Sequence, residues 1–129
     1  MGEHNYIKAN SLFFAVSTRG GGGSVLVHPM NKPGKIPMGA PTICGHRDTV
    51  YDFDFSPFNQ HILATGSGDS TIKVWEIPEG GLTENMTESV ATLEGHGRKV
   101  TLVQWHPTAE NVLASASADF TVKVWNVED

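Results

Sequence analysis

One stretch of sequence occurs twice in this chain, from Gly45 to Ile77 and again, 50 positions later, from Gly95 to Val127. The two copies align without a gap. Their identical pairs include Gly45/Gly95, His46/His96, Val50/Val100, Pro57/Pro107, Leu63/Leu113, Asp69/Asp119 and Trp75/Trp125. Such internal similarity predicts a repeat architecture, in which each unit leaves a hydrophobic face for its neighbour to cover.

Each copy contains three segments with the pattern of β-strands. Val50–Phe55 alternates apolar and polar residues, which predicts a half-buried strand. Two further strands are expected at 62–66 and 71–77, after the turn sequences Ser-Pro-Phe-Asn and Ser-Gly-Asp-Ser. The second copy repeats these three strands at 100–105, 112–116 and 121–127.

The residues outside the two copies predict further strands and no helix. Segments 11–17 and 24–28 are expected to form a hairpin around the glycine run at 20–23, and residues 1–10 are expected to be loosely held. Short strands are expected at 42–44 and 89–93. With about ten strands, the predicted class is all-β.

Composition excludes several classes of function. The chain has 129 residues and a net charge of −5, which disfavours general nucleic-acid binding and attraction to acidic membranes. The apolar run Leu12–Val16 is too short to span a membrane, so we expect no membrane insertion. The single cysteine, Cys44, cannot form an internal disulfide, which is typical of the cytoplasm. The six histidines lack metal-ligand spacing, so no metal or cofactor is expected.

A histidine, a hydroxyl residue, an aspartate and a tryptophan recur in both copies and can form one hydrogen-bonded chain. The indole N–H only donates, so burying it requires an acceptor. A Thr or Ser hydroxyl can accept that proton and bond the imidazole, whose other nitrogen can bond the aspartate. The predicted tetrads are His46, Thr65, Asp69 and Trp75 in the first copy, and His96, Ser115, Asp119 and Trp125 in the second.

An alternative interpretation of these residues is catalytic, because Ser or Thr, His and Asp also make up hydrolase triads. The same set occurs twice at a fixed offset, each time with a tryptophan, which favours a duplicated scaffold over a duplicated active site. We therefore expect no catalysis and no enzyme activity.

The glycine-histidine opening and the strand-borne tryptophan resemble the signature of WD repeats, which build four-stranded β-propeller blades in known members. The runs VWEIPEGGL at 74–82 and WHPTAENVL at 105–113 are similar to the coronins. This resemblance implies an all-β, partial WD-repeat propeller of antiparallel blades, about two and a half in number. It places an incomplete first blade in residues 1–44, a second blade in 45–94 and an incomplete third in 95–129.

Coronins bind filamentous actin and regulate its turnover, so the resemblance implies an actin-binding scaffold in the cytoplasmic actin cytoskeleton, with actin-regulatory proteins as further partners. The alternative is a general WD scaffold for another protein or peptide. WD binding positions carried over to this chain are Thr49, Tyr51, Gly68, Lys99, Thr101 and Ala118, and Arg47 and Arg98 add positive charge beside them. Coronins are several times longer, so the chain resembles an early fragment that would expose blade faces and self-associate as a homo-oligomer.

Overall fold

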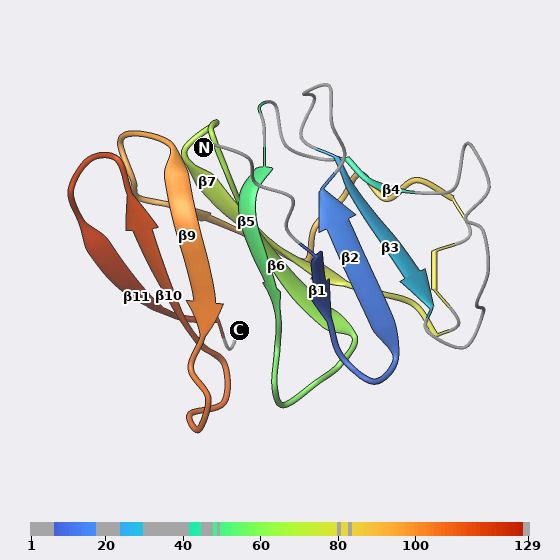
Figure 1. Cartoon of the computed structure of the whole chain (residues 1–129). Coiled ribbons are helices and arrows are strands. Elements are labelled where there is room, and N and C mark those ends of the chain that lie inside the picture. Colours follow the sequence, from blue (N-terminus) through green and yellow to red (C-terminus); the bar gives the residue numbers. More distant parts are fainter. Residues whose placement is uncertain are drawn as a thin grey trace.

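The described residues form eleven β-strands, which are arranged in three antiparallel sheets (Figure 1). The structure is a computed structural model that describes residues 7–17, 24–29, 42–44, 48, 50–79, 81–82 and 84–127. Within these residues there is no helix, and hence none that could cross a membrane. The predicted all-β class is confirmed.

The first sheet contains four strands in the order β1-β2-β3-β4. Their bounds are Ile7–Ala9 for β1, Phe13–Ser17 for β2, Val25–Pro29 for β3 and Thr42–Ile43 for β4. The sequence interpretation predicted no strand in residues 1–10 and an incomplete first blade. Both predictions are wrong, because β1 completes a four-stranded sheet. Three residues are too few to show an alternating pattern, and β1 forms because β2 pairs with it, with Ile7 opposite Val16. The predicted glycine turn and most of the proline-rich connection lie outside the described residues.

The two repeated units form the second and third sheets. The second has the order β5-β6-β7-β8, and the third has the order β11-β10-β9. Their bounds are Val50–Phe55 (β5), Ile62–Ser67 (β6), Thr71–Glu76 (β7), Ala91–Glu94 (β8), Val100–Trp105 (β9), Val112–Ser117 (β10) and Val122–Asn126 (β11). The predicted strand positions in both repeats agree with these bounds to within two residues.

The sheets pack against one another in a row, and β5 contacts both β1 and β9 (Figure 1). One hydrophobic cluster joins the first two sheets, including Phe13 and Val27 on one side and Phe53 and Trp75 on the other. A second cluster joins the second and third sheets and consists of Ala64, Ile72 and Val74 against Val100, Val103, Trp105 and Leu113. The core of the molecule therefore lies between the sheets.

Gly66 shows how closely the second and third sheets approach. A Cβ atom at this position would lie 2.7 Å from Cγ1 of Val100 and 3.0 Å from Cγ1 of Val103. Atoms cannot approach so closely, so a larger side chain here would push the sheets apart. The second copy has Ala116 at the matching position, on the side of the third sheet that faces away from the second.

Strand β5 is buried on both faces, which corrects the expectation of a half-buried strand. Asp52 is only 5% exposed, and its Oδ2 accepts a hydrogen bond of 3.0 Å from the backbone N–H of Val103. Asp54 Oδ2 accepts one from the backbone N–H of Trp105, also at 3.0 Å. Lys8 Nζ lies 3.7 Å from the Asp52 carboxylate and 3.9 Å from that of Asp54. The polar positions of β5 thus face the next sheet instead of solvent.

Burial raises the pKa of Asp54 above its ordinary value, while the N–H of Trp105 and the charge of Lys8 act in the opposite direction. Burying the ionised Asp54 carboxylate therefore costs desolvation free energy, and its hydrogen bond from the backbone of β9 offsets part of that cost.

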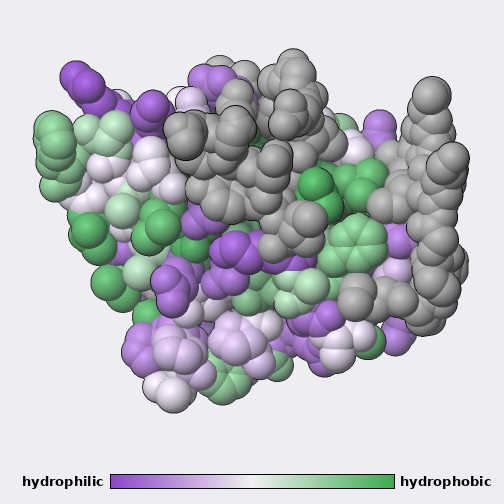
Figure 2. All heavy atoms as spheres, in the orientation of Figure 1, coloured by the Kyte–Doolittle hydropathy of each residue, from purple (hydrophilic) through white to green (hydrophobic). Residues whose placement is uncertain are grey.

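The free face of the third sheet is apolar. Leu102 is 50% exposed, Val122 is 73% exposed and Val124 is 70% exposed. Hydrophobic spheres gather on the left side of Figure 2, where this sheet lies in Figure 1. The matching residues of the second sheet, Ile72 and Val74, are buried under β9.

Candidate protein-interaction face

The tetrad of the second repeat is hydrogen-bonded throughout. Trp125 Nε1 donates to Ser115 Oγ at 2.9 Å, and His96 Nε2 lies 2.8 Å from the same oxygen. His96 Nδ1 lies 3.4 Å from Asp119 Oδ2 and 3.1 Å from Thr121 Oγ1. Since Ser115 Oγ accepts the indole proton, its own proton is available for His96 Nε2, which leaves the Nδ1 proton for the carboxylate side. The four predicted residues and Thr121 thus form one network.

Asp119 joins the β10–β11 turn to the loop between β8 and β9. Its Oδ2 accepts from the backbone N–H of Gly97 at 2.9 Å, and its Oδ1 accepts from the backbone N–H of Thr121 at 3.0 Å and from the Thr121 hydroxyl. The hydroxyl of Thr121, followed by the N–H of Gly97, holds the pKa of Asp119 well below the usual range of an aspartate. Because the carboxylate stays ionised, it fixes the two loops side by side.

The first repeat shows the same pairing where the structure describes it. Trp75 Nε1 donates to Thr65 Oγ1 at 3.0 Å, and both residues are fully buried. Asp69 Oδ1 accepts from the backbone N–H of Thr71 at 3.0 Å and from its hydroxyl at 2.6 Å. His46, the predicted link between the two pairs, lies outside the described residues.

The threonine two positions after each aspartate was missed by sequence reasoning. Thr71 and Thr121 occupy matching positions in the two copies, and each hydroxyl bonds the preceding aspartate. The signal was available in the alignment, since a hydroxyl recurs there in both copies.

The second tetrad also contains the residue types of a hydrolase triad, but Ser115 is enclosed. It is 1% exposed, and its oxygen already bonds both Trp125 and His96. A catalytic serine must present its oxygen to a substrate carbonyl. In this structure the Ser115 hydroxyl serves the packing of Trp125 instead.

Several predicted binding residues lie together at the same end of the sheets. Lys99 Nζ sits 5.1 Å from the centre of the Tyr51 ring, a cation–π contact between the third and second sheets. A Cβ atom at Gly68 would lie 3.2 Å from Tyr51 Cε2 and 2.7 Å from Asp48 Oδ2, so Gly68 lies directly beside the Tyr51 ring. Tyr51, Gly68 and Lys99 thus share one surface.

The remaining predicted positions follow on the third sheet. Arg98 and Thr101 are exposed, and the Ala118 N–H donates to the Lys99 carbonyl at 3.0 Å. Thr101 Oγ1 lies 3.4 Å from the Ala116 carbonyl. Arg47 and Thr49 lie outside the described residues.

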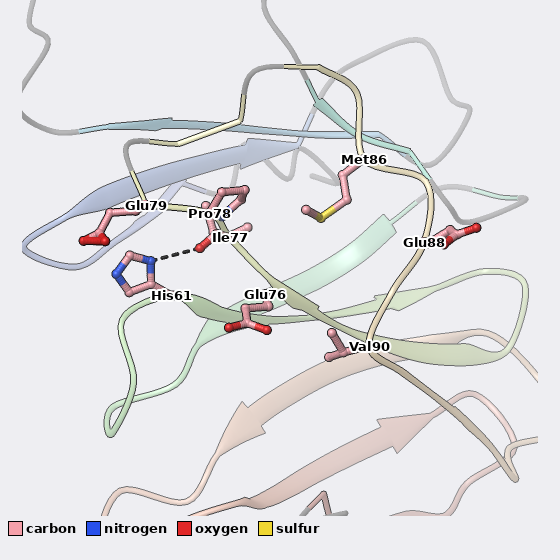
Figure 3. Close-up of a pocket in the computed structure, with 8 residues that line it drawn as sticks. All are labelled: His61, Glu76, Ile77, Pro78, Glu79, Met86, Glu88 and Val90. Atoms are coloured by element: carbon pink, nitrogen blue, oxygen red, sulfur yellow. Dashed lines mark hydrogen bonds between the residues drawn. The ribbon is translucent and has the colours of Figure 1, made fainter.

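A separate hollow of about 450 Å³ lies at the outer side of the second sheet (Figure 3). Its lining residues are His61, Glu76, Ile77, Pro78, Glu79, Met86, Glu88 and Val90. His61 Nδ1 donates to the Ile77 carbonyl at 2.9 Å, as drawn in Figure 3, so this nitrogen is occupied. The hollow is distinct from the surface that carries Lys99 and Tyr51, and its residues were not predicted as a site.

Comparisons with known proteins agree with this architecture. The model of the family "WD domain, G-beta repeat" matches residues 40–76 and 87–126, and a "Domain of unknown function (DUF1899)" matches residues 1–35. The WD-repeat matches cover the two repeated units. They define the class as a WD-repeat β-propeller protein.

The relatives that match within this class are coronins. Coronin-2B from Homo sapiens is 44% identical over 94 residues, which is 72% of this chain, and Coronin-2A from Bos taurus is 45% identical over 101 residues, or 78%. The crystal structure of the WD40 domain from Toxoplasma gondii coronin superposes with a TM-score of 0.87 at 36% identity, covering 94% of this chain and 31% of that one. This chain therefore belongs to the WD-repeat family, in its coronin branch. It spans about a fifth of the length of these curated relatives.

We expect Ser115→Ala to destabilise the fold by about 1–3 kcal/mol, because it leaves the Trp125 indole and a His96 nitrogen without their shared partner. Chemical denaturation would measure the change. The exposed-loop variant Thr87→Ala should lie within about 0.5 kcal/mol of wild type. In a Trp125→Phe background the cost of Ser115→Ala should shrink. Equal effects of the serine and loop variants would contradict the network.

The lowered pKa of Asp119 predicts a loss of stability in acid. The unfolded chain takes up a proton at this residue near pH 4, whereas the folded chain does so only at much lower pH. The stabilisation is therefore present above about pH 4 and declines as the pH falls toward the folded pKa. The difference in denaturation midpoint between wild type and Asp119→Asn should be constant above about pH 5 and should shrink progressively as the pH falls below about 4. A gap that is constant with pH would contradict the assignment, and Thr87→Ala serves as the control.

Proposed function

We propose that this chain is part of a coronin-like, actin-binding scaffold that acts through protein–protein contacts and without catalysis. The observation that carries the proposal is its 44% identity to Coronin-2B over 94 residues. On this proposal the protein works in the cytoplasm at the actin cytoskeleton, with filamentous actin and actin-regulatory proteins as partners. It neither binds nucleic acid nor inserts into membranes, in keeping with its net charge of −5.

The surface that carries Tyr51, Gly68 and Lys99 is the proposed contact area. Arg98 and Lys99 expose two positive charges on a chain that is acidic as a whole. Lys99 is also oriented by the Tyr51 ring, which lowers the entropy lost when a partner carboxylate binds it. Both features favour an acidic protein partner. Arg47, Thr49, Thr101 and Ala118 extend the proposed area by their positions in the repeat alone.

We expect the double reversal Arg98→Glu with Lys99→Glu to weaken co-sedimentation of the complete protein with filamentous actin by at least about tenfold, since two favourable charge contacts become repulsive. The matched control is Lys73→Glu with Lys123→Glu, which changes the net charge equally on the strands β7 and β11. Equal pelleting of wild type and the Arg98/Lys99 variant would contradict the proposed contact. If wild type itself fails to pellet, a general WD scaffold for another protein or peptide becomes the better proposal.

We also propose that the 129-residue chain on its own self-associates, with a second copy covering the free face of the third sheet. Leu102, Val122 and Val124 border a hollow of about 250 Å³ on that face. Ile72 and Val74, the counterparts of Val122 and Val124 in the second sheet, are buried in the core, so two strand positions that drive packing inside the chain remain open here. A large exposed apolar face favours association in water.

The mass of the isolated chain in solution tests this proposal. At tens of micromolar we expect sedimentation equilibrium to give a mass above the 13.9 kDa of one chain. Val122→Glu with Val124→Glu should restore the mass of one chain without unfolding it, because both side chains are exposed. A wild-type chain that is monomeric at this concentration would rule out self-association.

A further inference from the structure

Phe120, at the tip of the β10–β11 turn, is the most exposed of the large hydrophobic residues that the structure describes. Its side chain is 97% exposed, whereas a phenylalanine in a folded chain usually contributes to a core. The packing of the third sheet therefore does not account for its presence.

The backbone at Phe120 is strained as well. Its φ angle is +69°, in the left-handed region that suits glycine and asparagine and is an outlier for a bulky side chain. Ser70 occupies the matching position of the first repeat with a φ angle of +70°. The turn itself thus demands this conformation, and the aromatic side chain is an added cost. A strained residue that no described residue buries is a candidate for a functional role.

The turn that carries Phe120 is bonded to the loop that carries the two basic residues. Ser117 Oγ donates to the carbonyls of Arg98 at 3.1 Å and Lys99 at 2.9 Å, and the Phe120 N–H donates to the Ser117 carbonyl at 3.1 Å. Asp119 adds its bond to the Gly97 N–H. An aromatic ring and two cations therefore belong to one rigid corner of the third sheet.

The figures show the same corner of the third sheet. The β10–β11 turn lies at the upper left of Figure 1, and hydrophobic and strongly hydrophilic spheres adjoin at that corner in Figure 2. An apolar tip beside a charged rim has the composition of a protein-binding hot spot.

We propose that Phe120 is the apolar anchor of the partner contact, inserting into an apolar hollow whose rim carries carboxylates on an acidic protein surface. This inference rests on the proposed function and names a contact residue of the same surface. Arg98 and Lys99 pair with the carboxylates of the rim, while the ring fills the hollow. Because the turn is already fixed by Ser117 and Asp119, little loop entropy is lost on binding.

A protein fits this corner better than a lipid surface. Peripheral membrane binding by charge uses clusters of roughly four to eight basic residues, and interfacial helices bury a long apolar stripe. Here one aromatic residue projects from the β10–β11 turn and two cations project from the adjoining β8–β9 loop. A single buried anchor with a charged rim is sufficient for a protein interface.

The decisive variant is Phe120→Asn in the complete protein, tested by co-sedimentation with filamentous actin. Affinity should fall by at least about tenfold, since loss of a hot-spot side chain commonly costs that much. The unfolding midpoint should rise or stay unchanged, because asparagine tolerates the left-handed conformation. Binding is thus lost without any loss of stability, which a merely structural role would not produce. The matched control is Phe58→Asn, a 46% exposed aromatic in the β5–β6 turn, which should bind like wild type.

Two further variants secure the test. Phe120→Ser introduces the residue that the first repeat has at this position. It serves as the test variant if Phe120→Asn lowers the unfolding midpoint. Phe120→Trp keeps an aromatic side chain and should retain binding. If wild type pellets and the Asn and Ser variants pellet equally well, the anchor is overturned and the actin proposal stands. If wild type does not pellet, the actin proposal fails and the inference fails with it. Loss of binding to phosphatidylserine vesicles, with actin binding unchanged, would assign Phe120 to a lipid surface and overturn the inference.

Discussion

The packing of one sheet on the next is the interaction on which the rest of this structure depends. Val74 and Val124 are the same residue type at the same position of the two repeats, yet Val74 is 2% exposed and Val124 is 70% exposed. The third sheet covers Val74, and no described residue covers Val124. Burial of a strand in this fold is thus decided by its neighbour. Gly66 is part of the same constraint, because its missing side chain lets Val100 approach.

Close packing on both faces obliges the polar groups between the sheets to pair. Asp52 and Asp54 accept hydrogen bonds from the backbone of β9, and the buried indole of Trp75 donates to Thr65. Among the described residues, no buried side-chain polar atom lacks a partner. Unpaired polar groups in such positions would each cost about 1–3 kcal/mol. These bonds therefore specify which sheet faces meet, in addition to the apolar contacts.

Sequence reasoning predicted the features that repeat and missed those that depend on another unit. The alignment at an offset of 50 placed the strands of both repeats and grouped His96, Ser115, Asp119 and Trp125. It could not reveal β1, whose pairing with β2 outweighs its weak local pattern. It also predicted a half-buried β5, which places the polar Asp52 on the solvent side. The backbone N–H of Val103 that donates to Asp52 belongs to the next repeat, so the pattern of β5 alone could not reveal it. The strain at Phe120 was hidden for another reason, since a backbone angle is not written in residue types.

Comparison of Ser70 with Phe120 separates what the fold requires from what it permits. Both turns have nearly the same positive φ angle, so the backbone is a property of the repeat. In the second repeat the tetrad holds that backbone through Asp119 and its bond to the Gly97 N–H. Among the described residues the Phe120 side chain at the tip takes no part in sheet packing, so these contacts leave it free to differ between units. A duplicated scaffold of this kind can therefore carry an exposed apolar residue on one blade and a small polar residue at the same position of another. The only energetic cost is the local backbone strain at that residue.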